Sequence, residues 1–136
     1  MNKPIDTIGI IRESRFDENR APLAPEHIKK LKSKYPNLNI LVQPSAKRCF
    51  SDDEYKDNGA EINEDLTSCS IIFGVKEIDT DILINNKTYI FFSHTYKLNK
   101  ETLNSAQNTL GMDKKKLLKS IIEKNIKLID YENIRD

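Results

Sequence analysis

Short apolar runs alternate along the chain with segments of helical spacing. The runs lie at residues 7–11, 38–42, 70–75, 88–92 and 126–130 and are rich in apolar, β-branched and aromatic residues. Strands buried on both faces of a parallel sheet have this composition. The alternation predicts an α/β domain with a mostly parallel sheet flanked by helices, Rossmann-like or flavodoxin-like in kind.

Two of the intervening segments carry clear helix signals. Pro25 suits the first turn of a helix, Ile28 and Leu31 share one face, and Pro36 ends the pattern. The segment Ser51-Asp52-Asp53-Glu54 has the spacing of a capping box, with a glycine eight residues after the serine to end a short helix. A helical turn is expected at residues 79–84.

A third helix is predicted near the end of the chain. Asp113 is its candidate N-cap, and four apolar residues at helical spacing are expected to face inward: Leu117, Leu118, Ile121 and Ile122. Residues 97–112 are polar and rich in Asn and Thr, and a loop is expected there.

Composition narrows the class of protein. The chain has 136 residues, 38% of them hydrophobic and 32% charged, which fits one folded domain. The formal net charge of +1 predicts no basic face, so nucleic acid is not an expected partner. No signal peptide and no apolar run of spanning length occur, so a cytoplasmic protein with no membrane partner is expected. Cys49 and Cys69 should then be reduced thiols, and no zinc site is expected.

Ionisable residues follow four of the five predicted strands. In open parallel sheets, ligands bind beyond the carboxyl ends of the strands, so these residues are candidates for a site, although polar residues follow buried strands in any α/β protein. They are Arg12, Glu13, Arg15 and Arg20 after the first run, Lys76 and Glu77 after the third, Ser93, His94 and Thr95 after the fourth, and Tyr131 and Glu132 after the last.

Each leading candidate has a functional and a structural interpretation. Arg20 could grip a carboxylate with two parallel hydrogen bonds, or it is a solvated loop arginine. Lys76 could exchange protons, or it is a surface lysine that closes a strand. His94 could titrate near neutral pH, or it is a hydrogen-bonded structural histidine. Glu77 and Glu132 are surface carboxylates or electrostatic neighbours of a lysine. His27 is expected to be solvated.

The aromatic residues and the glycines add further expectations. Tyr131 and the Phe91-Phe92 pair are expected in the core rather than in a site. Gly9 lies within a predicted strand, and the four glycines of the chain form no G-x-G-x-x-G turn for a pyrophosphate. The chain is therefore not expected to bind a dinucleotide by itself.

Several motifs together resemble one known family. Gly9-Ile10-Ile11-Arg12-Glu13, then residues 18–25 (ENRAPLAP), Val75-Lys76-Glu77 and residues 91–95 (FFSHT) occur in this order. They resemble the amino-terminal domain of the alanine dehydrogenase and transhydrogenase family. Residues 42–45 (VQPS), 91–95 and 128–132 (LIDYE) are most similar to its saccharopine dehydrogenase, or lysine-ketoglutarate reductase, branch. The likeness runs from about Ile8 to Asp136 and is weakest over residues 97–111.

The resemblance implies roles for the candidate residues. It implies an NAD(P)-dependent amino-acid dehydrogenase in which a 2-oxo acid and lysine condense to an imine that is then reduced, or the reverse reaction. By analogy, Arg20 would hold the carboxylate of the oxo acid, and Lys76 and His94 would form the acid–base pair. Glu77 and Glu132 would tune the proton affinities of that pair.

The resemblance also implies what this chain needs from elsewhere. Residues 1–136 would form a single substrate-side domain that binds no cofactor or metal, and NAD or NADP would belong to a nucleotide-binding domain acting in cis or in trans. The isolated chain is then expected to be inactive. Two alternatives remain open: an alanine dehydrogenase domain, and a non-catalytic module that binds small carboxylates. The domain could also assemble as a homo-oligomer.

Overall fold

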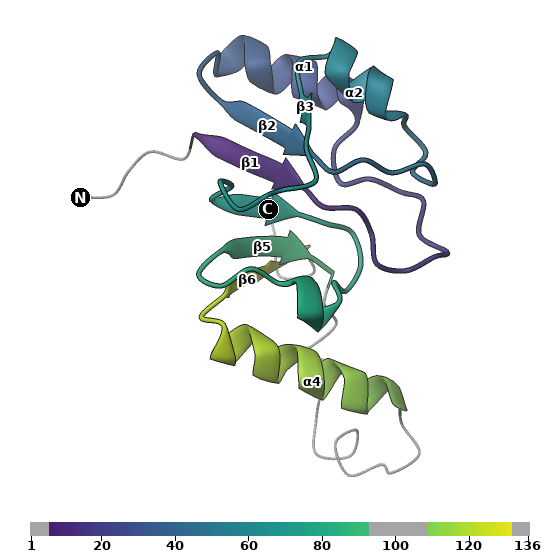
Figure 1. Ribbon diagram of the computed structural model, residues 1–136, viewed down its shortest axis with the longest axis vertical. Coiled ribbons are helices and arrows are strands. Elements are labelled where there is room, and N and C mark those ends of the chain that lie inside the picture. Colours follow the sequence, from purple (N-terminus) through teal and green to yellow (C-terminus); the bar gives the residue numbers. More distant parts are fainter. Residues whose placement is uncertain (1–5, 93–108, 132–136) are drawn as a thin grey trace, which may run out of the picture.

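Six parallel strands form the single sheet of the protein (Figure 1). The computed structural model describes residues 6–92 and 109–131. The strands lie in the order β3-β2-β1-β4-β5-β6. Their bounds are Thr7–Ile10 (β1), Asn39–Val42 (β2), Glu61–Ile62 (β3), Ile71–Phe73 (β4), Thr88–Phe91 (β5) and Lys127–Asp130 (β6). The predicted α/β fold with a mostly parallel sheet is confirmed.

β1 lies at the centre of the sheet, between β2 and β4. Ile8 pairs in register with Ile40 of β2 on one side and with Ile71 of β4 on the other. The chain runs outward from β1 to β3, then returns to β4 and continues to the opposite edge. The order of strands therefore reverses between β1 and β4, and at such a point the loops of the two strands leave on opposite sides and open a crevice.

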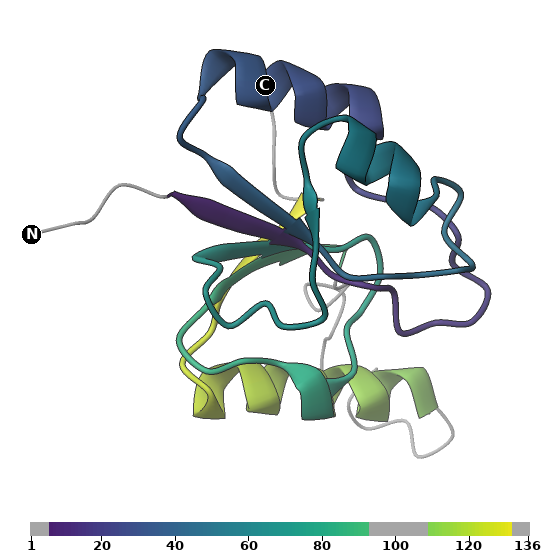
Figure 2. The same cartoon turned by 45° about the horizontal axis from the view of Figure 1, so that its top comes forward.

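Helices cover both faces of the sheet (Figure 2). α1 (Pro25–Lys34) and α2 (Asp52–Asp57) pack on one face, and α4 (Thr109–Glu123) lies on the other face with the 3₁₀ turn η1 (Thr80–Ile82). Successive side chains of a strand point to opposite faces of the sheet and so contribute to two core layers. Ile10 and Val42 face α1 and α2, whereas Leu41 faces the α4 side. No helix in the described part of the chain is long and apolar enough to cross a membrane.

Gly9 is in β1 because a side chain has no room there. A Cβ atom at this position would lie 2.7 Å from the Sγ atom of Cys69 and 3.3 Å from Leu66. Cys69 is fully buried, and burial raises the pKa of its thiol to about 11. Cys69 and the exposed Cys49 are both free thiols, as expected.

The predicted helix ends agree with the structure in their main features. Ser51 Oγ accepts a hydrogen bond from Glu54 N at 3.1 Å, and the Glu54 carboxylate accepts one from Ser51 N at 3.3 Å, which completes the capping box. Gly59 follows α2 with a φ of 106°, a conformation that glycine adopts readily. His27, expected to be merely solvated, accepts a hydrogen bond at Nδ1 from Ala24 N at 3.0 Å and so caps α1.

Three details of the expected elements were wrong. β3 was not predicted, because a strand of two residues has no periodicity to detect. Each of the five predicted strands is one to three residues shorter than its apolar run; β4, for example, covers only residues 71–73. α4 starts at Thr109, so residues 109–112 are helical rather than loop and Asp113 lies inside the helix instead of capping it. Gly111 then lies inside α4. Its cost of about 1 kcal/mol relative to alanine can be tolerated in a helix of 15 residues.

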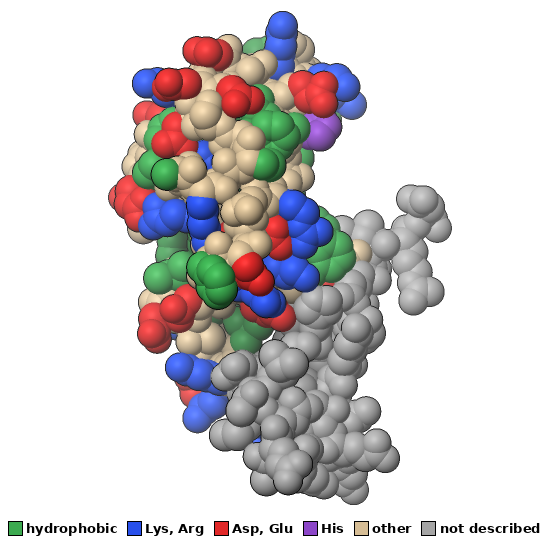
Figure 3. Space-filling view, turned by 90° about the vertical axis from the view of Figure 1, so that its right-hand side faces the viewer, with side chains coloured by type: hydrophobic (Ala, Val, Ile, Leu, Met, Phe, Trp, Pro, Cys, Tyr) green, Lys and Arg blue, Asp and Glu red, His purple; other side chains and the backbone are tan. Residues whose placement is uncertain are grey.

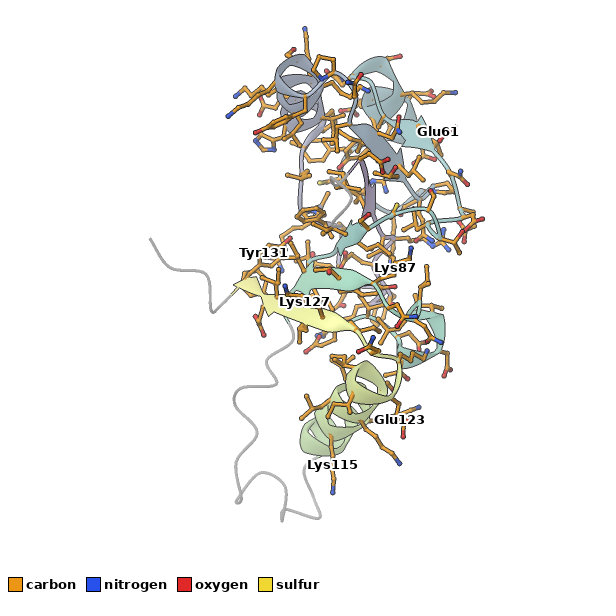
Figure 4. The ribbon with its side chains drawn as sticks, turned by 90° about the vertical axis from the view of Figure 1, so that its left-hand side faces the viewer. Glu61, Lys87, Lys115, Glu123, Lys127 and Tyr131 are labelled. Carbon is orange, nitrogen blue, oxygen red and sulfur yellow. The ribbon has the colours of Figure 1, made fainter. Side chains whose placement is uncertain are left out.

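The inward face of α4 is also narrower than predicted. Leu117 and Ile121 are 3% and 6% exposed, whereas Leu118 and Ile122 are 39% and 72% exposed. Successive residues of a helix are about 100° apart, so a single stripe contacts the sheet and the next residue along faces outward. Figure 4 shows Lys115 and Glu123 on the outer side of the same helix.

Substitution of the adjacent leucines tests this orientation. Leu117→Ala should lower the free energy of unfolding by about 2 to 5 kcal/mol, because it leaves a cavity in the core. Leu118→Ala, the matched control, should cost less than about 1 kcal/mol. Urea unfolding monitored by circular dichroism measures both values. Equal losses for the two variants would contradict the orientation of α4.

Candidate functional site

The loops that follow β1, β2 and β4 meet at the carboxyl edge of the sheet. Figure 3 looks onto this edge and shows Lys and Arg side chains gathered beside Asp and Glu side chains near its middle. The acidic and basic groups belong to segments that are far apart in the sequence. Their contacts decide which of the predicted site residues come together.

Arg20 and Glu18 form a bidentate ion pair at this edge. Nε and Nη2 of Arg20 donate to the two oxygens of Glu18 at 2.9 and 2.7 Å, and the Arg20 amide adds a third bond at 3.0 Å. These bonds lower the pKa of Glu18 to about 2. The Glu18 side chain is 7% exposed but that of Arg20 is 67% exposed. Among the described residues, Arg20 Nη1 forms no hydrogen bond, so Nη1 and one hydrogen of Nη2 can bind a ligand from solvent.

Glu13 holds the backbone that carries Lys76. Its carboxylate is buried and accepts hydrogen bonds from Val75 N at 3.0 Å and from Lys76 N at 2.8 Å. Burial raises the pKa of Glu13, while the two hydrogen bonds from backbone amides oppose that rise. A buried acidic side chain thus links the loop after β1 to the loop after β4.

Arg20 and Lys76 act electrostatically on the same carboxylate. Attraction to the Lys76 ammonium contributes to the lowered pKa of Glu18, whose first cause is the Arg20 pair. Arg20 is in turn attracted by Glu13. Of the three residues predicted to form the site, Arg20 pairs directly with Glu18. Lys76 acts on that carboxylate only through its charge, because no hydrogen bond or ion pair joins the two side chains among the described residues. The third, His94, lies outside the described residues, as does Glu132.

Glu77 has a neighbour that the sequence did not suggest. Its carboxylate lies 3.8 Å from Nη1 of Arg15, which also lies 3.4 Å from Asp17 through Nε. The backbone oxygen of Arg15 accepts a hydrogen bond from Lys47 Nζ, so the β2 loop adds a further cation to the edge. Glu77 is thus oriented toward a second arginine of the β1 loop.

Arg12 belongs to a separate, structural contact. Its guanidinium binds both oxygens of Glu64 at 2.8 and 2.7 Å and the backbone oxygen of Pro44 at 2.9 Å. A pocket of about 420 Å³ lies beside this pair, on the α4 side of the sheet, and neither Arg20 nor Lys76 lines it. The space beside Arg20 is much smaller, about 10 Å³, and is lined also by Glu13, Glu18 and Lys47. A ligand of Arg20 would therefore lie over the edge rather than inside a cavity.

Tyr131 directly follows β6 at the same edge, at the opposite end of that strand from Lys127 (Figure 4). Its ring lies 4.8 Å from that of Phe92, and burial raises the pKa of its hydroxyl to about 12, with Glu13 as a second cause. Phe91 is fully buried, as predicted. The phenol thus packs beside Phe92 and stays protonated at neutral pH.

The central roles of Glu13 and Glu18 at this edge were missed from the sequence. A carboxylate two residues before Arg20 was a visible signal for the ion pair, because both lie in one short loop. The bonds from Glu13 to residues 75 and 76 had no such signal, since they span 62 and 63 positions of the chain.

Neither a cluster of metal ligands nor a glycine-rich nucleotide turn occurs among the residues that the structure describes. Within residues 6–92 and 109–131, no three His, Cys, Asp or Glu side chains gather to hold a metal ion. The sequence has no glycine-rich turn, and Gly9 lies inside β1, where its Cβ position is filled by neighbours. The chain does not fit the pyrophosphate of NAD(P) by that motif.

With this geometry established, sequence comparison identifies the family. The pattern of the family described as "Alanine dehydrogenase/PNT, N-terminal domain" matches residues 9–136. The chain belongs to this family, and the resemblance stated from its motifs is confirmed.

Curated relatives place the chain beside much longer proteins. It is 36% identical over 132 residues to an alpha-aminoadipic semialdehyde synthase of Arabidopsis thaliana, a match that covers 93% of this chain. It is 39% identical over 119 residues, 88% of this chain, to the mitochondrial alpha-aminoadipic semialdehyde synthase of Mus musculus. The chain spans only 11% of the length of each relative.

Solved structures share the fold. An L-alanine dehydrogenase superposes with a TM-score of 0.70 over 93% of this chain and 32% of its own, at 19% identity. A transhydrogenase from Sinorhizobium meliloti superposes with a TM-score of 0.68 over 92% of this chain and 35% of its own, at 17% identity. At these identities the likeness establishes the architecture alone.

The Glu18–Arg20 pair predicts a pH dependence of stability. A carboxylate whose pKa is lowered on folding adds stability above its ordinary pKa of 4.5, and this is lost as the pH falls toward about 2. Glu18→Gln should therefore lower the free energy of unfolding at pH 7 by about 1 kcal/mol, because Arg20 is well exposed and solvent screens the pair.

Urea unfolding of both proteins at pH 7, 4 and 2.5 measures this effect. The difference between wild type and Glu18→Gln should shrink as the pH falls. Asp17→Asn is the control, because Asp17 is exposed and only approaches Arg15, and it should change little. A Glu18→Gln difference that stays constant with pH would show that the carboxylate charge contributes nothing.

Proposed function

We propose that this chain is the substrate-binding and acid–base part of an NAD(P)-dependent amino-acid dehydrogenase of the saccharopine dehydrogenase type. The reaction is the reductive condensation of a 2-oxo acid with lysine, or its reverse. The observation that carries the proposal is the Glu18–Arg20 ion pair on the carboxyl edge, where the strand order reverses between β1 and β4, with Lys76 near enough to contribute to the lowered pKa of Glu18. The family and the semialdehyde synthase relatives support the same class of reaction.

In this proposal, Arg20 binds the carboxylate of the 2-oxo acid. The guanidinium is held by two hydrogen bonds to the buried Glu18 carboxylate, so its remaining N–H groups have a fixed direction toward solvent. Two parallel charge-assisted bonds to a carboxylate require such a planar, oriented donor. Glu18 thus makes Arg20 a rigid anchor rather than a mobile loop side chain.

Lys76 and His94 supply the proton transfers. The nitrogen of the amine attacks the carbonyl carbon, a C–N bond forms, and the carbonyl oxygen takes a proton to give a carbinolamine. That oxygen takes a second proton and leaves as water, while the nitrogen loses protons and becomes the imine. Lys76 would donate to the oxygen through Nζ, and His94 would accept from the amine.

Reduction of the imine requires a nucleotide-binding domain in addition to these residues, in cis or in trans. Because the chain has no phosphate-binding glycine turn, the 136 residues alone should not turn over NADH with 2-oxoglutarate and lysine. Absorbance at the nicotinamide band measures this directly. Turnover by the purified chain would contradict the division of labour between two domains.

Binding of 2-oxo acids tests the role of Arg20. Isothermal titration of the chain should detect weak binding of 2-oxoglutarate, and Arg20→Ala should weaken it at least about tenfold through loss of a bidentate charged contact. Arg15→Ala is the matched control, because it removes the same charge from the same loop without lining the space beside Glu18. Equal loss in both variants would indicate nonspecific attraction and contradict the assignment.

Comparison of two acids in the same titration separates the two dehydrogenase types. Tighter binding of 2-oxoglutarate than of pyruvate is the expected result for the saccharopine type. The reverse order would favour the alanine dehydrogenase type, whose solved representative shares this fold.

A further inference from the structure

The strand order reverses between β1 and β4. Beyond the ends of these strands, a side chain instead of the backbone provides the hydrogen-bond acceptors that join them. Ile11 N donates to Phe73 O at 3.0 Å, which is the last backbone hydrogen bond between the two strands. Just beyond it, the amides of Val75 and Lys76 find their acceptors in the Glu13 carboxylate, at 3.0 and 2.8 Å. Each oxygen of Glu13 accepts one amide, so both acceptors are used on successive residues.

The surroundings leave this carboxylate little freedom. Glu13 is 9% exposed, and a Cβ on Gly74 would lie 3.5 Å from its Oε2 and 3.1 Å from Ile11. From the other side, Phe92 N donates to Val75 O at 2.9 Å, so β5 holds the same segment. The Lys76 backbone is therefore clamped between two strands.

The Lys76 side chain has no comparable restraint of its own. Among the residues that the structure describes, no hydrogen bond or ion pair is formed by its ammonium. The groups around the Glu13 carboxylate are Glu18 and Arg20 of its own loop, Lys47 of the β2 loop and Tyr131 after β6. The direction of the ammonium toward this cluster thus depends on the backbone that Glu13 holds.

We propose that Glu13 is a positioning residue, which fixes the main chain of Lys76 and so places its ammonium beside Glu18 and Arg20. This inference rests on the acid–base role proposed for Lys76 and adds the residue that makes that role possible. In this role Glu13 acts on Lys76 rather than on the reacting atoms. It acts through two amides just beyond the last backbone hydrogen bond between β1 and β4.

Nuclear magnetic resonance of the full chain tests the clamp in the wild type first. The amide signals of Val75 and Lys76 should shift together as the pH is changed, with one common midpoint above 4.5, because both amides donate to one carboxylate with a raised pKa. Amides that do not titrate together would overturn the proposal. This measurement needs no variant and no ligand.

Glu13→Gln then tests the positioning role. A carboxamide can accept from one amide but presents its own N–H groups to the other, so hydrogen exchange of Val75 or Lys76 should speed up at least about tenfold. Exchange at Gly74, whose amide donates to Ile90 O, should stay slow if the sheet is intact. Glu64→Gln is the control for loss of one charge at the same edge, since Glu64 binds Arg12 instead.

Addition of 2-oxoglutarate separates positioning from binding. In the wild type the ligand should perturb the signals of both Arg20 and Lys76, whereas in Glu13→Gln it should perturb Arg20 but no longer Lys76. A Lys76 response unchanged in a folded Glu13→Gln would overturn the proposal. A wild type in which neither residue responds would instead contradict the proposed function, and the amide titration and exchange would still decide whether Glu13 holds Lys76.

Discussion

The carboxylate of Glu13 lies between β1 and β4, where the order in which the chain adds strands to the sheet reverses. On either side of it the chain runs to opposite edges, and within the described residues no backbone–backbone hydrogen bond joins the loops after β1 and β4 beyond Ile11 N to Phe73 O. Two hydrogen bonds from the amides of residues 75 and 76 to this side chain replace the backbone hydrogen bonds that would join adjacent strands. The charged cluster at the carboxyl edge depends on these two hydrogen bonds, because Arg20 comes from one loop and Lys76 from the other.

Electrostatic roles at the edge are divided between two acidic residues of one loop. Glu18 lies against Arg20, and its lowered pKa keeps it ionised at all ordinary pH values. Glu13 is buried against backbone amides, and its pKa moves in the opposite direction. One carboxylate thus orients a cation that faces solvent, while the other orients the peptide of a second cation. The same residue type performs two tasks because the surroundings differ.

Most of the fold could be predicted from the sequence, because strands buried on both faces leave continuous apolar runs and helices leave capping signals. The five longer strands, the capping box at Ser51 and the buried Phe91 all follow from such local patterns. The two-residue β3, the start of α4 and the outward direction of Ile122 did not, because each depends on packing against a distant element. Arg20 and Lys76 were recognised as candidates through motifs, and their shared neighbour Glu18 was not.

The sequence by itself determined the class of fold, the family and the kinds of side chain that gather at the carboxyl edge, since these depend on periodicity and on local motifs. Tertiary structure alone decided which of those side chains meet. A hydrogen bond between residues 13 and 76 joins positions 63 apart, and its existence depends on β1 and β4 being neighbours in the sheet. No local pattern carries that information, because strand order arises from the packing of the whole chain.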